Sequence, residues 1–390
     1  MKKFLSIFSV VLLISSITLA GCGKSGSQSA NANAPKVGAD DPQTGPLTIN
    51  PALPKGGKIL SKGPHGETAV PASSLKLTEK DLAQLKKGRY TAAIVMHYAG
   101  NDWSTAQIAG LKAAFKRMGI KVIAVTDAQF KAEKQVSDIE TVIAKKPDII
   151  VSIPVDAVST SDAYKKAAAA GIKLVFMDNA PDGMQAGKDY VSVVSADNYG
   201  NGVAAANIMA KELGGKGKIG VVYHDADFFV TRQRTEAFEK TIREKYPNIK
   251  IVARGGISGQ NDGEKVASGM LTKNPNLDGI FVVWDVPAEG ALAAARTAGK
   301  QDLVITTCDL GTNVALEMAQ KNGIVKGLGA QLPYDQGISE AILAGYSLLG
   351  RKTPAYVAVP ALSVTRENVL KAWKLVYHTD APKEIQQAAK

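Results

Sequence analysis

The sequence predicts an α/β protein built from two doubly wound parallel-sheet lobes that are joined by a hinge. From Tyr90 onward, short runs rich in Val, Ile and Leu alternate with amphipathic segments of helical period. The strand-like runs are apolar throughout, which is typical of parallel strands buried on both faces. The series is too long for one open sheet of ordinary size, so we expect two sheets with a break near residues 195–198.

The first half of this series is expected to form the first sheet and its helices. Strands are expected at residues 92–96, 122–125, 149–153, 174–177 and 191–194, and helices at residues 104–117, 132–144 and 159–170. Each helix carries apolar residues at intervals of three and four, so one face can cover the sheet.

The second half repeats the pattern. Strands are expected at residues 219–223, 251–253, 279–283, 303–308 and 325–329, and helices at residues 200–213, 230–245, 263–272, 287–298, 313–320 and 335–350. From this organisation we expect an N-terminal lobe of residues 89–195 plus 332–362. The C-terminal lobe is expected to contain residues 196–331 plus 363–390.

The N-terminus has the layout of an export signal. Lys2 and Lys3 precede an apolar run over residues 4–19, and small residues follow it. The sequence Leu19-Ala20-Gly21-Cys22 resembles the bacterial lipobox, which implies a lipoprotein signal peptide over residues 1–21 and lipid attachment at Cys22. An ordinary signal peptide with an incidental cysteine is the alternative.

Residues 22–88 are expected to form a flexible tether with a short helix. Up to about Ser74 this stretch is rich in Ser, Gly, Ala, Asn and Pro, and its prolines interrupt regular structure. A capping box that begins at Thr78 predicts a helix reaching Lys87. The tether would hold the folded body away from a membrane.

Composition and charge exclude several function classes. The net charge is +11, but lysines occur singly and no nucleic-acid-reading module is present, so no nucleic-acid partner is expected. The chain has two cysteines. If Cys22 carries lipid, Cys308 has no partner, and its apolar surroundings suggest a buried small hydrophobe.

Polar and aromatic residues gather where the predicted strands end. Ligands bind at the carboxyl ends of strands in doubly wound sheets, so these loops are where a site should be sought. They contain Asn101 to Trp103, Asp156, Asp178 and Asn179, Asp225 to Phe229, Trp284 and Asp285, Asp309, and Gln331. Such residues can also serve only as helix caps, and that reading stays open for each position.

Taken in order, these loops resemble the type I periplasmic binding proteins, the ribose- and galactose-binding branch of the substrate receptors of ABC importers. The resemblance spans about residues 90–364. The segments that carry it are Gly100 to Trp103, Phe176 to Asn179, Ser195 to Gly200, Thr231 to Phe238, Cys308 to Gly311, and Gln331 to Gly337. Asp102 stands where the family has Pro, and Trp284 stands where the ribose branch commonly has Asn.

The resemblance implies a sugar or polyol held in a cleft between the lobes. The residues that it and the loop chemistry assign to ligand binding are Asn101, Trp103, Asp178, Asn179, Phe229, Arg232, Trp284, Asp309 and Gln331. Carboxylates, amides and guanidinium groups match sugar hydroxyls, and aromatic faces match sugar C–H surfaces. Arg234 is expected to be structural. No cofactor, metal site or catalytic residue is expected.

The expected partners are a small sugar or polyol, an ABC permease and a membrane reached through the lipid anchor, with the protein itself monomeric. The chain lacks a Gly-x-Ser-x-Gly elbow and a Walker A loop. A receptor that presents ligand to a sensor kinase or chemoreceptor, and a surface glycosidase acting through paired carboxylates, remain as alternatives.

Overall fold

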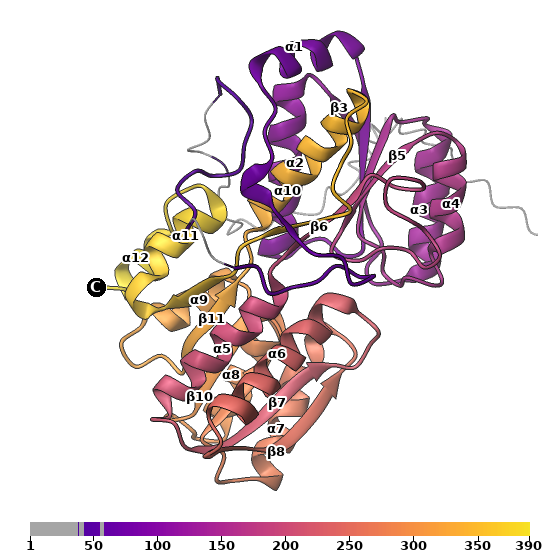
Figure 1. Cartoon of the computed structure of the whole chain (residues 1–390). Helices are drawn as coiled ribbons and strands as arrows, with labels where there is room; N and C mark the ends of the chain where they lie inside the picture. Colours follow the sequence, from indigo (N-terminus) through magenta and orange to yellow (C-terminus); the bar gives the residue numbers. More distant parts are fainter. Residues whose placement is uncertain (1–37, 39–42, 55–57) are drawn as a thin grey trace, which may run out of the picture. The chain divides into compact units, whose positions relative to one another are not determined.

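A computed structural model describes residues 38, 43–54 and 58–390 of the chain (Figure 1). The expected signal peptide and Cys22 lie outside the described residues. Among the residues that are described, no helix combines the length and apolar character required to cross a bilayer.

The first sheet has seven parallel strands in the order β1-β12-β6-β5-β4-β2-β3. Its strands are β1 (Val70–Pro71), β2 (Thr91–Met96), β3 (Lys121–Asp127), β4 (Ile149–Ser152), β5 (Lys173–Met177), β6 (Ser192–Ala196) and β12 (Tyr356–Val359). The helices associated with it are α1 (Glu79–Gly88), α2 (Asp102–Met118), α3 (Ala132–Ala144), α4 (Ser161–Ala169) and α10 (Pro333–Leu348).

Both faces of this sheet are buried, as its apolar strands predict. Alternate residues of β2 enter two separate cores: Ile94 and Met96 pack with α2 and α10, whereas Ala93 and Val95 pack with α3 and α4. Figure 1 shows the same arrangement, with α2 and α10 together and α3 and α4 on the other side. The faces of the sheet are therefore covered by helices, which leaves the strand ends as the places where a ligand can approach.

The second sheet has six strands in the order β13-β11-β10-β9-β7-β8. Its strands are β7 (Gly217–His224), β8 (Ile249–Ile257), β9 (Gly279–Val282), β10 (Val304–Cys308), β11 (Val325–Ala330) and β13 (Leu362–Thr365). The helices associated with it are α5 (Asn198–Glu212), α6 (Phe229–Lys245), α7 (Gly263–Lys273), α8 (Asp285–Thr297), α9 (Thr312–Ala319), α11 (Val369–Tyr377) and α12 (Lys383–Ala388). Short 3₁₀ turns lie at Gln260–Asp262 and Arg366–Asn368 beside this sheet, and at Ala72–Ser74 beside the first.

The doubly wound α/β prediction is confirmed, with two additions at the C-terminal end. β12 completes the first sheet, and β13 joins the second sheet antiparallel to β11. β13 runs antiparallel because the chain enters the second sheet two residues after β12 and from the end at which β11 finishes, so that Leu362 pairs with Ala330. The chain therefore moves between the sheets three times, after Ala196, after Ala330 and after Val359.

The tether prediction is wrong for most of the described N-terminal residues. Leu47, Ile49 and Leu53 are buried in the main core, and β1 is the edge strand of the first sheet. Apolar residues spaced among the prolines drive this packing, because each buried Leu or Ile contributes about 1.5–3 kcal/mol. We call residues 43–54 and 58–77 the N-terminal strap.

The strap contacts chain segments that lie far away in sequence. The backbone N–H of Asn50 donates to Oδ1 of Asp335 at 2.7 Å, a separation of 285 residues. The backbone N–H groups of Leu60 and Ser61 donate to the two carboxylate oxygens of Asp197, at 3.0 and 2.8 Å. Asp197 is also the N-cap of α5, so the strap holds the first point at which the chain leaves the first sheet.

Candidate functional site

A small cavity of about 70 Å³ lies where loops from the carboxyl ends of both sheets meet. It is lined by His97, Tyr98, Asn101, Trp103, Phe130, Ile153, Asp178, His224, Phe228, Val230, Thr231, Arg234, Gln260, Trp284, Asp309 and Gln331. This is where doubly wound sheets place ligands, and it combines charged side chains with aromatic rings.

Two aspartates occupy equivalent places in the two halves. Asp178 directly follows β5 and Asp309 directly follows β10, and both have positive φ, at 57° and 69°. Asp tolerates this left-handed conformation better than most residues because its short side chain can bond locally. In both sheets the backbone therefore turns sharply at the strand end and presents a carboxylate there.

A continuous chain of hydrogen bonds connects the two aspartates. Ser195 Oγ donates to Asp178 Oδ1 at 2.6 Å, and Asn198 Nδ2 donates to Ser195 Oγ at 3.0 Å. Arg234 Nε donates to Asn198 Oδ1 at 2.8 Å. The chain passes through the first crossover between the sheets, so the two halves of the site are joined where the backbone also connects them.

The second half of this chain is centred on Arg234. Its Nη1 donates to Oδ2 of Asp309 at 2.9 Å, and Gln331 Nε2 donates to Oδ1 of the same carboxylate at 2.8 Å. The Arg234 side chain is only 3% exposed. Burial by itself lowers the pKa of the guanidinium, but Asp309, Cys308 and Asp178 together outweigh that effect and raise it.

The carboxyl group of Asp178 has a pKa that is raised toward neutral pH. Burial raises its pKa to about 6, against the opposing effects of the hydrogen bond from Ser195 and the charge of Arg234. Its Oδ2 accepts no hydrogen bond from the described residues. A hydroxyl donor in the cavity would give this oxygen a partner and would favour the ionised carboxylate.

Aromatic rings form the rest of the wall. The His97 ring stacks on Phe228 at 5.8 Å between centroids and meets the edges of Phe130 and Trp103 at 4.9 and 6.0 Å. The His224 ring lies 5.2 Å from Trp284. Burial lowers the pKa of His97 to about 3, so this imidazole is neutral and contributes an uncharged surface.

Two polar contacts close the gap between the halves beside the cavity. Thr312 at the start of α9 donates to Oδ2 of Asp102 from its backbone N, at 2.6 Å, and from Oγ1, at 2.7 Å. Gln260 Nε2 donates to the Tyr98 hydroxyl at 3.1 Å. These contacts join residues from the two sheets without the help of a ligand.

The structure brings six of the nine expected binding residues into this cavity. They are Asn101, Trp103, Asp178, Trp284, Asp309 and Gln331. Asn101 also caps α2 by accepting a hydrogen bond from the backbone N of Ser104 at 2.9 Å, so its capping and lining roles coexist. Trp103 is 8% exposed, and its Nε1 has no partner among the described residues.

The structure places Arg232, Phe229 and Asn179 outside the cavity. Arg232 is half exposed and pairs with the exposed Asp227, whereas Arg234, expected to be structural, lines the site. Residues two apart on a helix point to nearly opposite sides, so only one arginine of this pair can face the cavity.

The other two residues are displaced by their local structure. Phe228 lines the cavity in place of Phe229 because it precedes α6 in an extended conformation, whereas Phe229 is the first residue of the helix. Asn179 is buried behind Asp178, and its Oδ1 has no partner among the described residues.

Sequence reasoning did not assign several lining residues to the site. His97, Tyr98, Phe130, His224 and Gln260 were not among the expected ligand-binding residues. His97 and His224 stand at the ends of β2 and β7, which is the signal that could have identified them.

Comparison with known proteins gives a consistent picture. Residues 92–352 match the family model described as "Periplasmic binding protein domain". The ribose import binding protein RbsB of Salmonella typhimurium is 27% identical over 301 residues, which cover 77% of this chain and 98% of that protein.

Solved structures agree with this match. A periplasmic solute-binding protein of an ABC transporter from Actinobacillus succinogenes, solved with bound D-allose, is 28% identical with a TM-score of 0.64, covering 72% of this chain and 99% of that one. An Agrobacterium vitis solute-binding protein solved with α-D-tagatopyranose has a TM-score of 0.68 at 24% identity, covering 74% and 99% of the two chains, and supports the fold.

Proposed function

Because the chain belongs to the periplasmic binding protein domain family, we propose that it is an extracytoplasmic solute-binding protein that delivers a sugar or polyol to an ABC permease. The protein binds its ligand in the cavity between the two sheets and releases it unchanged. Its relatives are binding proteins rather than enzymes.

The observation that carries this proposal is the hydrogen-bonded series from Asp178 to Gln331 beside two indole rings. Carboxylates accept hydrogen bonds from sugar hydroxyls, and Arg234 and Gln331 can donate to them. Trp103 and Trp284 can cover the C–H faces of a sugar ring. A charged hydrogen bond contributes about 1.5–3 kcal/mol, so three or four contribute about 4.5–12 kcal/mol, a range that includes the roughly 8 kcal/mol of micromolar affinity.

We propose that each sheet is the core of one lobe, with boundaries near residues 89–195 plus 332–362 and 196–331 plus 363–390. The strands adjust two of them by one residue, since Ala196 ends β6 in the first sheet and Leu362 begins β13 in the second. β1 adds residues of the strap to the first lobe. The three crossovers would act as the hinge, and ligand favours the closed arrangement because it contacts both lobes at once.

The anchor belongs to the same proposal. Cleavage before Cys22 and lipid attachment there would hold a monomeric protein at the outer face of the cytoplasmic membrane. Replacing Cys22 with Ser should release the protein into the medium or periplasm. Continued fractionation of the variant with membranes would contradict the anchor.

The test of ligand binding is a thermal-shift screen of pentoses, hexoses and polyols, followed by calorimetry on each compound that stabilises the protein. We expect at least one neutral polyhydroxy compound to bind with micromolar or better affinity, and Asp309→Asn to abolish that binding. Failure of every such compound would overturn the proposal.

Two further measurements separate the remaining roles. Uptake of the same compound should be lost when the protein is deleted and restored by the wild-type chain. If deletion of the protein leaves uptake intact but abolishes a transcriptional or chemotactic response to the compound, a receptor that presents ligand to a sensor would be favoured. Turnover of a chromogenic glycoside that is lost in Asp178→Asn would favour a hydrolase.

A further inference from the structure

We propose that the end of the first lobe that lies opposite the cavity is an electrostatic docking face for an anionic lipid membrane. This inference does not depend on the ligand or on lipid attachment at Cys22. It rests on how charge is distributed between the two ends of the first sheet.

All strands of the first sheet are parallel, so they begin at one end and finish at the other. The end at which they begin is surrounded by the last turns of helices and the loops that follow them. Its exposed cations are Lys86, Lys87, Arg89, Lys116, Lys121, Lys145, Lys146, Lys165, Lys166, Lys173, Lys188, Arg351 and Lys352. We call this surface the basic end.

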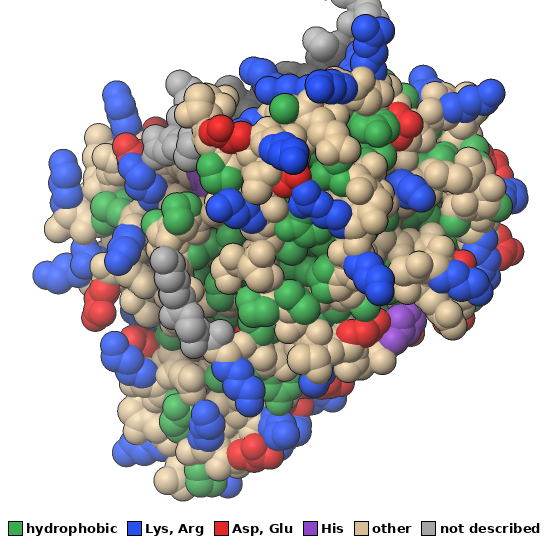
Figure 2. Space-filling model, turned by 45° about the horizontal axis from the view of Figure 1, so that its top comes forward, with side chains coloured by type: hydrophobic (Ala, Val, Ile, Leu, Met, Phe, Trp, Pro, Cys, Tyr) green, Lys and Arg blue, Asp and Glu red, His purple; other side chains and the backbone are tan. Residues whose placement is uncertain are grey.

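Few carboxylates offset these cations. Asp81 is buried and paired with Arg351, and Glu140 pairs with Lys166 at 2.9 Å. Asp148 accepts hydrogen bonds from both the backbone N and the hydroxyl of Thr91, at 2.8 and 3.1 Å. Asp189 accepts one from the backbone N of Gln185, at 2.9 Å. In Figure 2, where the top of the molecule comes forward, blue Lys and Arg side chains are spread over this end with fewer red carboxylates among them.

The opposite end of the same sheet is acidic. Asp102, Asp127, Asp156, Asp178 and Asp182 all lie at or beyond the carboxyl ends of its strands. Lysines at helix C-termini are favoured by the helix dipole, which explains some of the cations. The excess of cations at one end and of carboxylates at the other orients the lobe in the field of a negative surface.

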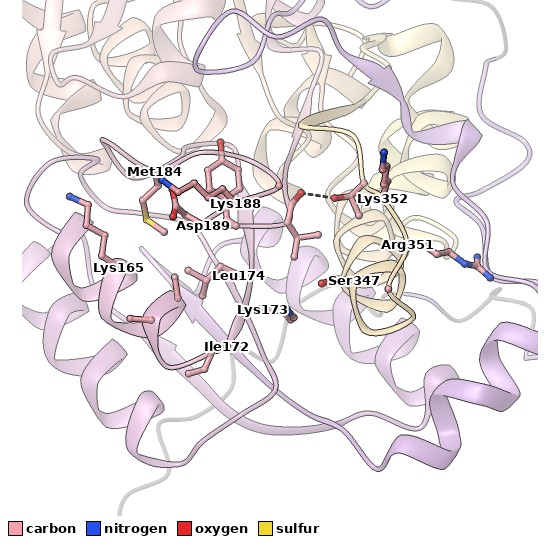
Figure 3. Close-up of a pocket in the computed structure, with 18 residues that line it drawn as sticks. Lys165, Ile172, Lys173, Leu174, Met184, Lys188, Asp189, Ser347, Arg351 and Lys352 are labelled. Carbon is pink, nitrogen blue, oxygen red and sulfur yellow. Dashed lines mark hydrogen bonds between the residues drawn. The ribbon is translucent and has the colours of Figure 1, made fainter.

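A shallow groove of about 780 Å³ lies within the basic end, between the end of α4, the start of β5 and the loop after α10. Figure 3 shows Lys165, Lys173, Lys188 and Lys352 in its lining, together with Ile172, Leu174, Met184 and the carboxylate of Asp189. No ion pair is found for Lys173, Lys188 or Lys352 among the described residues. The groove therefore offers three ammonium groups, unpaired within the described part of the chain, beside apolar side chains and the carboxylate of Asp189.

A membrane fits this surface better than a single anionic polymer strand does. The cations are distributed over the ends of α1, α2, α3, α4 and α10 rather than along one track. A planar array of phosphate headgroups can reach many of them at once, and each lysine near an anionic bilayer strengthens binding about fivefold. Docking in this orientation turns the cavity away from the bilayer, so the docked state is distinct from the one that delivers ligand to a permease.

The test measures sedimentation of the exported chain carrying Cys22→Ser with lipid vesicles, so that neither leader nor acyl chain contributes. The chain with no further substitution should bind vesicles of phosphatidylglycerol mixed with phosphatidylcholine and should not bind vesicles of phosphatidylcholine alone. Raising the salt from low to about 0.15 M should weaken the binding, because the charges involved are exposed.

Two variants of equal charge change locate the face. Lys121→Glu, Lys145→Glu, Lys173→Glu and Lys188→Glu together should lower the vesicle partition coefficient at least about tenfold. The matched control is Lys216→Glu, Lys250→Glu, Lys265→Glu and Lys273→Glu, on exposed positions of the second lobe, and should change it less than about twofold.

Three results would overturn the inference. They are equal losses in the two variants, no binding to phosphatidylglycerol vesicles, and binding to soluble polyphosphate without binding to vesicles. Unchanged melting temperatures and unchanged sugar affinity would show that both variants remain folded.

Discussion

Asp102 and Thr312 join the two halves of the protein through one carboxylate oxygen. Thr312 donates both its backbone N–H, at 2.6 Å, and its hydroxyl, at 2.7 Å, to Oδ2 of Asp102. Asp102 begins α2 beside the first sheet, and Thr312 begins α9 beside the second. An acidic side chain from one lobe therefore caps a helix of the other, with a favourable interaction with its dipole.

We expect Asp102→Ala to weaken ligand binding about tenfold even though Asp102 does not line the cavity, because two charge-assisted hydrogen bonds stabilise the closed arrangement. Calorimetry gives the affinity, and small-angle X-ray scattering should show a larger radius for the ligand-free variant. Asp227→Ala, which removes only an exposed pair with Arg232, is the control and should leave both unchanged. An unaltered affinity in Asp102→Ala would show that the hydrogen bonds between Asp102 and Thr312 do not support ligand binding.

The two arginines of α6 should differ sharply on truncation. Arg234→Ala leaves the buried Asp309 carboxylate without its cation, so we expect a loss of about 3–5 kcal/mol in the free energy of unfolding and loss of ligand binding. Arg232→Ala removes an exposed pair and should change stability by less than about 0.5 kcal/mol. Urea unfolding and calorimetry measure both effects. The reverse order would mean that α6 is rotated from the orientation described here.

Ligand affinity should depend on pH through Asp178, whose pKa is raised to about 6 by burial. A ligand hydroxyl that donates to this carboxylate favours its ionised form, so affinity falls as protonation proceeds. Between pH 7 and pH 5 we expect the dissociation constant to rise about tenfold. Calorimetry at both values measures this, and Asp178→Asn should bind weakly with no such dependence.

The same shift affects the stability of the ligand-free protein, with the sign set by the raised pKa. Between the ordinary value of 3.8 and about 6, the folded state holds the Asp178 proton that the unfolded chain has lost. The contribution of this group is therefore fully present below pH 3.8 and declines as the pH rises through 6. Asp178→Asn should remove this decline in chemical unfolding followed across that range.

Intrinsic fluorescence should report ligand binding through two of the three tryptophans. Trp103 and Trp284 line the cavity, whereas Trp373 is fully buried in α11. Ligand should change the emission of wild type and of Trp373→Phe to a similar degree. In the double variant Trp103→Phe, Trp284→Phe the ligand-induced change in emission should vanish. A change that persists in the double variant but is lost in Trp373→Phe would show that ligand binds elsewhere.

Much of the fold follows from the apolar periodicity. The predicted helix at residues 132–144 coincides with α3, and most other elements differ only at their ends. The strap was not predicted because its structure depends on partners such as Asp197 and Asp335 rather than on local pattern. β12 and β13 were missed for a related reason, since each is a four-residue strand whose pairing is set by the sheet it joins.

The site was predictable where a strand end alone positions the side chain, as at Asp178 and Asp309. It was not predictable in α6, where an Arg-x-Arg pattern cannot by itself say which arginine faces inward. The spacing of Val230, Arg234 and Phe238 places Arg234 on the buried side of the helix, and this was the available signal.

The N-terminal strap also constrains the order in which the protein can reach its final form. Asn50 leaves the ribosome early, but its partner Asp335 follows 285 residues later, and β1 must wait for β12. Closure of such distant contacts is slow. The first lobe therefore cannot be completed until nearly the whole polypeptide has been synthesised.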